Sequence, residues 1–325
     1  MAKAVREQRR IGGLSWTASD LRADTSWIRH FRQTELREIE RVASSMISSA
    51  RSSKAKPKHH TVPLPSLEST LPLTRQDLIY GRGVALLRGL KVDDYDLDIL
   101  RILYLVLASH LGTVVPQNSE GDTITYVTSS LDANSEYQDH PQSRGHRGRA
   151  SMSAHSDSAD IVGLFCIRPA KRGGCTHICS SLAIHDELLR GHSEYLPTLY
   201  EGFYFDMTGN VRNTNVSASR IPVFQKSRHG VTCHFNQRRI EVGMKAANVL
   251  LRRSQKAALA EMTRLAESKT LSLDINLVPG DILFLNNHIT LHGRDEYEDG
   301  RDHNQKRLLL RIWLGCAKEI LSRGR

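Results

Sequence analysis

The sequence predicts an α+β protein whose core is a double-stranded β-helix (a jelly roll) with flanking helices, and three observations favour this fold class. The candidate strands of the central and C-terminal parts are short and separated by long insertions. Alternating βαβ units, which would indicate a doubly wound parallel sheet, are absent from the sequence pattern. The stretch 61–325 has a length that suits one domain of this kind, and we expect a single jelly-roll domain there.

Residues 1–60 are predicted to form a basic N-terminal extension with one helix. They hold 13 Lys and Arg residues against 6 Asp and Glu residues, and so carry most of the formal net charge of +10. Apolar residues recur at helical spacing in 34–50, which predicts the helix. The run 51–60 (RSSKAKPKHH) is typical of a solvated loop, and contact with a polyanion is the alternative.

Two patterns follow the extension. The segment 78–90 (LIYGRGVALLRGL) predicts a strand broken by glycines, and 96–112 predicts a core helix that ends at Gly112. The polar stretches 130–150 and 206–220 predict loops that could act as lids over a site.

The remainder of the chain is predicted to be rich in strands. The candidate strands lie at 160–168, 175–181, 281–285, 288–292 and 307–314. Helical patterns near 183–200 and near 247–268 interrupt them.

The composition excludes several protein classes. With 39% hydrophobic and 25% charged residues, the chain is neither disordered nor fibrous. No apolar stretch approaches the roughly 18 to 20 residues of a membrane span, and no apolar segment follows the charged start MAKAVREQRR, so we expect a cytoplasmic protein without a membrane partner. The 5 cysteines are an odd number, which favours free thiols over a disulfide framework.

His155 and Asp157, in the segment AHSDSAD, are two residues apart at an expected strand end, so both side chains project from one face. A third donor is available far downstream in NNHITLHGR, from His288 or His292. Two histidines and one carboxylate make the facial triad of non-haem Fe(II) oxygenases, which leaves coordination positions open for a cosubstrate and O₂.

The last predicted strand (RLLLRIWL) has two different faces. Its even positions are wholly apolar and must be buried, while Arg307, Leu309, Arg311 and Trp313 share the other face. If that face points inward, the two arginines require anions, and a carboxylate suits a guanidinium well. An amphipathic edge strand with solvated arginines is the alternative.

Four motifs in order resemble the taurine-dioxygenase-like (TauD/TfdA) family of Fe(II)/2-oxoglutarate-dependent oxygenases. They are HSD at 155–157, RPAKRGGCT at 168–176, VPGDILFLNNHITLHGR at 278–294 and KRLLLRIWL at 306–314. The resemblance covers about residues 78–315. It implies a cupin-like double-stranded β-helix and an enzyme that hydroxylates or desaturates an aliphatic C–H bond of a small molecule, with release of succinate and CO₂.

The resemblance also implies roles for particular residues. His155, Asp157 and His292 correspond to the iron ligands, and His288 is then a supporting or core histidine. The cofactors it implies are Fe(II), with 2-oxoglutarate and O₂ as cosubstrates.

The cosubstrate would be held near the last strand. Thr176 and Arg307 correspond to the family residues that bind the distal carboxylate of 2-oxoglutarate, and Arg311 corresponds to an arginine that reaches the substrate in relatives. An insertion between His292 and Arg307 leaves open which of Arg307 and Arg311 holds 2-oxoglutarate.

Several polar residues occupy segments that the family places around the mouth of the active site. The candidate substrate contacts are Gln117, Asn118, Tyr126, Asn236, Arg238 and Arg311. Two arginines among them indicate a carboxylate-bearing substrate such as an amino acid or a natural-product intermediate.

Three alternatives stay open on the sequence. A non-catalytic jelly-roll binding protein would lack turnover, and an oxygenase acting on nucleic acid would use the basic N-terminal segment, although nucleic acid is the less favoured partner. Cys175, His177 and Cys179 alternate along one strand and could bind zinc, but a second ligand pair is missing from the sequence pattern.

Overall fold

A computed structural model describes residues 14–52, 62–129, 148–207, 218–227, 230–302 and 305–316. Most of the predicted loop 130–150, the middle of the predicted loop 206–220 and most of the basic run 51–60 lie outside the described residues. Among the described residues, no helix is both long and apolar enough to cross a membrane.

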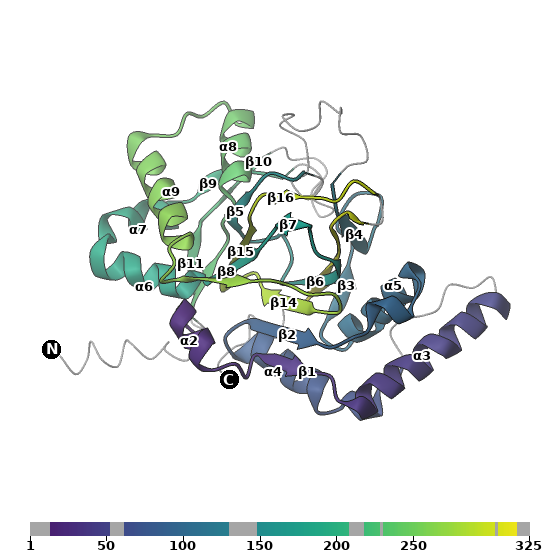
Figure 1. The fold of residues 1–325 in the computed structure, drawn as a ribbon. Helices are drawn as coiled ribbons and strands as arrows, with labels where there is room; N and C mark the ends of the chain where they lie inside the picture. The colour runs from purple at the N-terminus through teal and green to yellow at the C-terminus, as the bar shows by residue number, and fades with distance from the viewer. Residues whose placement is uncertain are drawn as a thin grey trace.

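Two mostly antiparallel sheets form the centre of the molecule (Figure 1). The larger, seven-stranded sheet has the order β1 (Ile28–His30), β2 (Val84–Arg88), β14 (Ile282–Asn286), β6 (Ile161–Arg168), β17 (Leu308–Gly315) and β3 (Thr113–Val115), with β4 (Ile124–Val127) also paired to β17. The four-stranded sheet has the order β13 (Ser272–Ile275), β8 (Thr176–Ser180), β15 (Thr290–Arg294) and β5 (Met152–His155). Only the β1–β2 pair among these strands is parallel within the described ranges.

The two sheets face each other across a shared apolar cluster. Leu164 and Leu283 of the larger sheet and Ile178 and Leu273 of the smaller sheet belong to it. The face-to-face packing places the ends of β5, β15 and β17 around one interior region, where the candidate site lies.

Helices cover both outer sides (Figure 1). One group packs on the larger sheet: α3 (Gln33–Ser52), α4 (Thr70–Tyr80) and α5 (Leu97–Ser109). The other group packs by the smaller sheet: α6 (Ser181–Gly191), α7 (Leu196–Glu201), α8 (Gln237–Ala246) and α9 (Arg253–Ala266). Beside it lie two short ribbons, β9 (Phe203–Asp206) with β10 (Ala218–Ile221) and β11 (Phe224–Ser227) with β12 (Gly230–Cys233).

Short elements complete the described fold. They are α2 (Ala18–Ala23), the ribbon of β7 (Arg172–Gly173) with β16 (Tyr297–Glu298), and single-turn 3₁₀ helices at Pro65–Leu67, Val92–Asp94 and Ser193–Tyr195.

The N-terminal segment is part of the core. In addition to the expected helix, α3, its described residues form α2 and the strand β1, which pairs with β2. Trp16 and Trp27 are 1% and 5% exposed and pack between the sheets, and the Trp16 indole donates to the carbonyl of Arg82. The domain boundary at residue 60 stays a prediction, but residues before it contribute to the same apolar core.

Most predicted elements are confirmed. The helices predicted at 34–50 and 96–112 are α3 and α5, although α5 ends at Ser109 and not at Gly112. The strands predicted at 160–168, 175–181, 281–285 and 307–314 are β6, β8, β14 and β17. On β17, the even positions are buried in the cluster beneath α5, as expected.

Two predicted strands need correction. Residues 78–80 end α4, and only Val84–Arg88 of the segment 78–90 is a strand, because Gly81 caps the helix through bonds to its last carbonyls. The strand predicted at 288–292 begins at Thr290, since the Asn286 side chain accepts from the backbone N–H of His288 and closes a turn.

The helical predictions were incomplete. The pattern near 183–200 is divided into α6 and α7 by a 3₁₀ turn, with Pro197 in the first turn of α7. The pattern near 247–268 holds α9 from Arg253 on, whereas the preceding residues follow the end of α8 and include Asn248 with a φ of 54°.

Candidate metal centre

Three side chains that lie up to 137 positions apart in the sequence converge at one end of the smaller sheet. His155 ends β5, Asp157 follows two residues later, and His292 lies directly opposite His155 on β15. Their donor atoms all lie within 4.8 Å of one another. Each histidine Nε2 is 4.0 Å from a carboxylate oxygen of Asp157, which is too long for a hydrogen bond and leaves room for an ion between them. Two imidazoles and one carboxylate fit Fe(II).

Both histidines present Nε2 to the carboxylate of Asp157. Nδ1 of His155 lies 3.0 Å from the carbonyl oxygen of Ser153, and a hydrogen bond donated to that oxygen fixes the ring with Nε2 directed at the site. Burial, with a further contribution from the neighbouring His155, lowers the pKa of His292 to about 3, so its ring is neutral and able to bind a metal ion.

Asp157 is held in its charged form. Burial alone would raise its pKa, but Arg311 and the two histidines, with a hydrogen bond from Trp313, hold the pKa well below the usual range. The indole Nε1 of Trp313 donates to Oδ2 at 3.0 Å, and Nη1 of Arg311 is 3.4 Å from both oxygens. The backbone N–H of Asp157 donates to the side chain of Asn287 at 3.1 Å.

Gln117 positions Arg311. Its Oε1 accepts from Nε of Arg311 at 2.8 Å, while its Nε2 donates to the carbonyl oxygens of Thr123 and Arg311 at 2.9 and 2.8 Å. Gln117 is 5% exposed, so the amide is a buried connector between the loop after β3 and the strand β17.

A second cationic region lies around the ring of Tyr297, between β15 of the smaller sheet and the residue before β17 of the larger sheet. Arg307 and Thr176 are 4% and 3% exposed, and Thr176 is the direct partner of Arg294 across the β8–β15 pair. The guanidinium groups of Arg294 and Arg307 lie 4.7 and 5.2 Å from the centre of the Tyr297 ring. Burial, together with the charge of Arg307, lowers the pKa of Arg294 to about 10.

A cavity of about 310 Å³ opens beside Asp157. Apolar side chains such as Phe205, Ile221 and Val223 form part of its wall, and His234 and His288 are polar members of the lining.

His288 differs in its surroundings from His155 and His292. Its Nε2 is 2.8 Å from Oδ1 of Asp160, so the pair forms a polar end of the cavity. Burial, with the charges of Arg239 and His288, lowers the pKa of His234 to about 4.

None of the six candidate substrate residues, Gln117 and Arg311 included, is among the described residues that line this cavity. The amide of Asn118 donates to Asp122, and Asn236 caps α8 by accepting from the backbone N–H of Arg239. Tyr126 is 36% exposed, and Arg238 is exposed on the first turn of α8. Their roles stay predictions.

The structure does not bring together the three residues of the zinc alternative. Cys179 is 1% exposed and packs in the apolar cluster by α6, whereas Cys175 and His177 lie near Asp295. His177 contacts Asp274 and Asp295 at 2.8 and 2.6 Å, which makes it the centre of a hydrogen-bonded acidic network.

Four residues of the site were not predicted from the sequence. They are Asn287, Arg294, Tyr297 and Trp313. Trp313 was placed on the inward face of the last strand, and the segment LHGR already contained Arg294, but neither pattern reveals a partner. Their contacts depend on how strands far apart in the chain are brought side by side.

Comparisons with known proteins agree with this geometry. The family model described as taurine catabolism dioxygenase TauD, TfdA family matches residues 50–313. FR-33289 synthase of Streptomyces rubellomurinus (strain ATCC 31215) is 29% identical over 261 residues, which are 78% of this chain and 75% of that protein. The taurine hydroxylase-like protein SAT17 of Stachybotrys chartarum (strain CBS 109288 / IBT 7711) is 28% identical over 262 residues, which are 78% of this chain and 66% of that protein.

Solved structures share the fold. Asparagine oxygenase in complex with Fe(II), 2S,3S-3-hydroxyasparagine and succinate matches with a TM-score of 0.68 at 16% identity, over 89% of this chain and 93% of that one. The non-haem iron oxygenase OrfP in complex with Fe and α-ketoglutaric acid matches with a TM-score of 0.64 at 14% identity, over 89% of this chain and 94% of that one.

Proposed function

The chain belongs to the taurine catabolism dioxygenase TauD, TfdA family and is an Fe(II)/2-oxoglutarate-dependent oxygenase, and from this premise we propose that it hydroxylates an aliphatic C–H bond of a small, carboxylate-bearing molecule. The observation that carries the proposal is the convergence of His155, Asp157 and His292 beside a buried cationic region. We assign these three residues as the iron ligands. Two facing antiparallel sheets support a jelly-roll core around them.

Arg307 and Thr176 are the proposed ligands of the distal carboxylate of 2-oxoglutarate. Arg311 is less suited to this role, because its guanidinium already contacts Asp157 and Gln117. Arg307 is buried, and within the described ranges no salt bridge joins its side chain to a carboxylate. A dicarboxylate that supplies the missing anion therefore fits Arg307 better.

The chemistry of the bound group is that of the family. Iron, when bound with 2-oxoglutarate and O₂, supplies the oxidising power: 2-oxoglutarate becomes succinate and CO₂, one oxygen atom enters succinate and the other enters the C–H bond of the substrate. The protein's own part is to hold Asp157 charged through Arg311 and Trp313 and to keep the imidazole of His292 neutral. Hydroxylation is the proposed outcome, and desaturation is the alternative outcome at the same centre.

The proposed substrate site is the cavity beside Asp157. A volume of about 310 Å³ is at the lower end for ligand pockets, which favours a small molecule. Its apolar wall would cover a methylene chain, and the His288–Asp160 pair offers a polar contact. Arg311 does not line this cavity, and its contact with an anionic substrate group stays a prediction from the sequence. The solved neighbours bind hydroxyasparagine or hydroxyarginine, which supports an amino acid or a related natural-product intermediate as substrate.

A substrate-free measurement tests the assignment. Fe(II) and 2-oxoglutarate are added without O₂ to the full chain and to His155→Ala, and the weak visible charge-transfer band of the chelate is recorded. We expect the band in the wild-type protein only. Equal spectra from the two proteins would contradict the assignment of His155 as an iron ligand.

A further inference from the structure

A group of buried donors surrounds the Tyr297 ring. Arg294, Tyr297 and Arg307 are 5%, 5% and 4% exposed, and both guanidinium groups contact the aromatic ring. Within the part of the chain that the structure describes, no salt bridge joins Arg294 or Arg307 to a carboxylate. Asp299 is engaged nearby, since its two oxygens accept from the backbone N–H of Arg307 and from the hydroxyl of Ser129.

Several donors of this group lack partners. Nε and Nη1 of Arg294, Nη1 of Arg307 and the hydroxyl of Tyr297 have no hydrogen-bond acceptor among the described residues. Nη2 of Arg294 is occupied by the carbonyl oxygens of Gly148 and Ala150 at 3.0 and 2.6 Å. Burying charged donors without an acceptor costs free energy, so we expect this group to bind an anion.

The turn at Gly173 and Gly174 brings Tyr297 to this position. Both glycines have positive φ angles, 71° and 72°, and Gly173 pairs with Tyr297 in the β7–β16 ribbon. A Cβ atom on Gly173 would overlap the carbonyl oxygen of Glu296, and one on Gly174 would be 3.2 Å from Cβ of Tyr297. The glycines therefore allow the close approach that places the aromatic ring against the arginines.

The group also lies at a suitable distance from the metal centre. Arg294 follows His292 by two residues on β15, so the two side chains share a face about 7 Å apart along the strand. Thr176 is its cross-strand partner and lies on the same face. A keto acid that chelates a metal at His292 and carries its second carboxylate two methylene groups beyond the keto carbon would extend toward these donors.

We propose that Arg294 and Tyr297 bind the distal carboxylate of 2-oxoglutarate together with Arg307 and Thr176, so that two guanidinium groups select a dicarboxylate cosubstrate. The inference rests on the proposed function, because it needs the keto acid to chelate iron at the assigned centre. It adds two cosubstrate-binding residues that the motif resemblance does not assign.

A purely structural role for Arg294 is the competing explanation. Its bonds to Gly148 and Ala150 hold the chain just before β5, which carries His155. Loss of those bonds would disturb the metal centre and weaken every chelating ligand to the same extent. The two explanations therefore differ in how a ligand without a distal carboxylate behaves.

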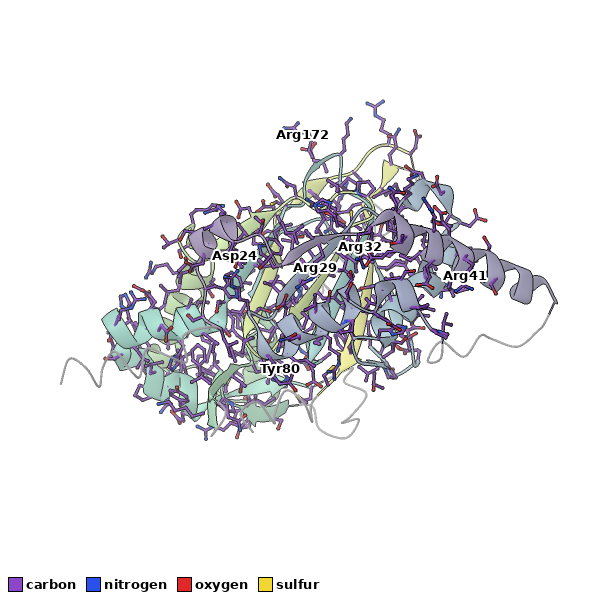
Figure 2. All side chains as sticks on the ribbon, turned by 90° about the horizontal axis from the view of Figure 1, so that it is seen from below. Asp24, Arg29, Arg32, Arg41, Tyr80 and Arg172 are labelled. Atoms are coloured by element: carbon purple, nitrogen blue, oxygen red, sulfur yellow. The ribbon has the colours of Figure 1, made fainter. Side chains whose placement is uncertain are left out.

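The test compares 2-oxoglutarate with oxalate, which chelates iron but has no distal carboxylate. Dissociation constants are measured by calorimetry on the Fe(II)-loaded full chain without O₂, for the wild type, Arg294→Gln, Tyr297→Phe and Arg307→Gln. The matched control is Arg172→Gln, since Arg172 lies on the same β7–β16 ribbon but projects into solvent (Figure 2).

We expect Arg294→Gln to bind 2-oxoglutarate about 10- to 100-fold more weakly and Tyr297→Phe about 3- to 10-fold more weakly, with oxalate affinity and the control unchanged. An equal loss for both ligands, or no loss for either, overturns the inference while Arg307→Gln still reports on the proposed function. If Arg294→Gln does not fold, Tyr297→Phe decides by the same comparison. If the wild type binds 2-oxoglutarate no better than oxalate and Arg307→Gln changes nothing, the proposed cosubstrate site itself fails.

Discussion

The indole of Trp313 is the nearest uncharged donor to the carboxylate of Asp157, and it predicts a measurable effect on metal affinity. Replacing Trp313 with Phe keeps an aromatic ring on β17 but removes the 3.0 Å hydrogen bond to Oδ2. Outer hydrogen bonds to ligands typically contribute a factor of about 10 to 100 in metal affinity or activity. We expect a loss of this size in Fe(II) affinity, measured by anaerobic titration of the metal-free protein.

Trp27→Phe is the matched control for this prediction. Its indole also donates a buried hydrogen bond, to the carbonyl of Leu21, but it lies between the sheets and away from the donors of the metal centre. Trp27→Phe should lower the unfolding temperature and leave Fe(II) affinity unchanged. Equal metal affinities for the wild type and Trp313→Phe would show that the indole does not position Asp157.

His234 predicts a pH dependence of stability. Burial lowers its pKa from 6.5 to about 4 in the folded chain, so between these values the unfolded chain binds a proton that the folded chain does not. Stability therefore falls as pH decreases from about 6.5 to about 4, by up to about 3 kcal/mol from this residue. His234→Gln should show a flatter decline in urea-unfolding free energy over this range, and an unchanged slope would contradict the prediction.

The residues of the site were predictable to different degrees. His155, Asp157 and Arg307 stand in motifs whose spacing is visible in the sequence, and their assignment as ligands stays a prediction until the metal measurements are made. Trp313 could not be paired with Asp157 from the sequence, because 156 positions separate them and only the packing of β17 beside the turn after β5 joins them. Arg294 was not singled out from the sequence, because its place beside Tyr297 depends on the pairing of strands that are far apart in the chain.

At the scale of elements, the long and strongly patterned segments were predicted and the short ones were not. The helix α5 and the strands β6 and β17 have apolar faces that repeat over many residues. The ribbon strands have weak patterns: β11 reads FQKS, with one apolar residue. That strand is stabilised by packing of Phe224 in the cluster by α6 and α9, which no local pattern shows.

The turn before β14 predicts a large loss of stability on substitution. Gly280 has a φ of 90°, and a Cβ atom there would overlap the backbone carbonyl of Leu90. Gly89 also has a positive φ, 105°, but a Cβ atom there would have no atom within 4 Å. Both Ala variants bear the cost of a left-handed conformation, about 1 to 2 kcal/mol, and only Gly280→Ala adds a backbone clash.

The comparison of the two glycine variants separates the cost of the steric clash from the cost of the left-handed backbone conformation. We expect Gly280→Ala to lose at least about 2 kcal/mol more than Gly89→Ala in urea unfolding, because the overlapping carbonyl belongs to Leu90, whose side chain is buried in the apolar core. Equal losses would mean that the turn relaxes around the added methyl group.

For the whole molecule, the N-terminal segment contributes both core and charge. Trp16, Trp27 and Phe31 are buried, and Ile39 of α3 is 1% exposed. Each large apolar side chain contributes about 1.5 to 3 kcal/mol by burial, and a domain has only about 5 to 15 kcal/mol to lose.

Deletion of residues 1–60 is therefore expected to leave a protein without a cooperative thermal transition. A deletion of residues 1–13 is the control for shortening the chain, because it spares every described residue. A cooperative transition near that of the full chain after removal of 1–60 would contradict the assignment of this segment to the core.

The same packing decides how a nucleic-acid role must be tested, since a deletion that unfolds the protein cannot report on binding. Figure 2 shows Arg29, Arg32 and Arg41 along β1 and α3, and each is paired with an acidic residue, Asp77, Glu35 and Glu38 respectively. These ion pairs partly neutralise their charge. The lysines of the run 51–60 are therefore the residues to substitute in a test of nucleic-acid binding. In the full chain, Lys54→Gln, Lys56→Gln and Lys58→Gln together should leave retention on DNA and RNA unchanged at ~50 and ~200 mM salt. A strong salt-dependent retention that the triple variant loses would instead make a polyanion a partner of this oxygenase.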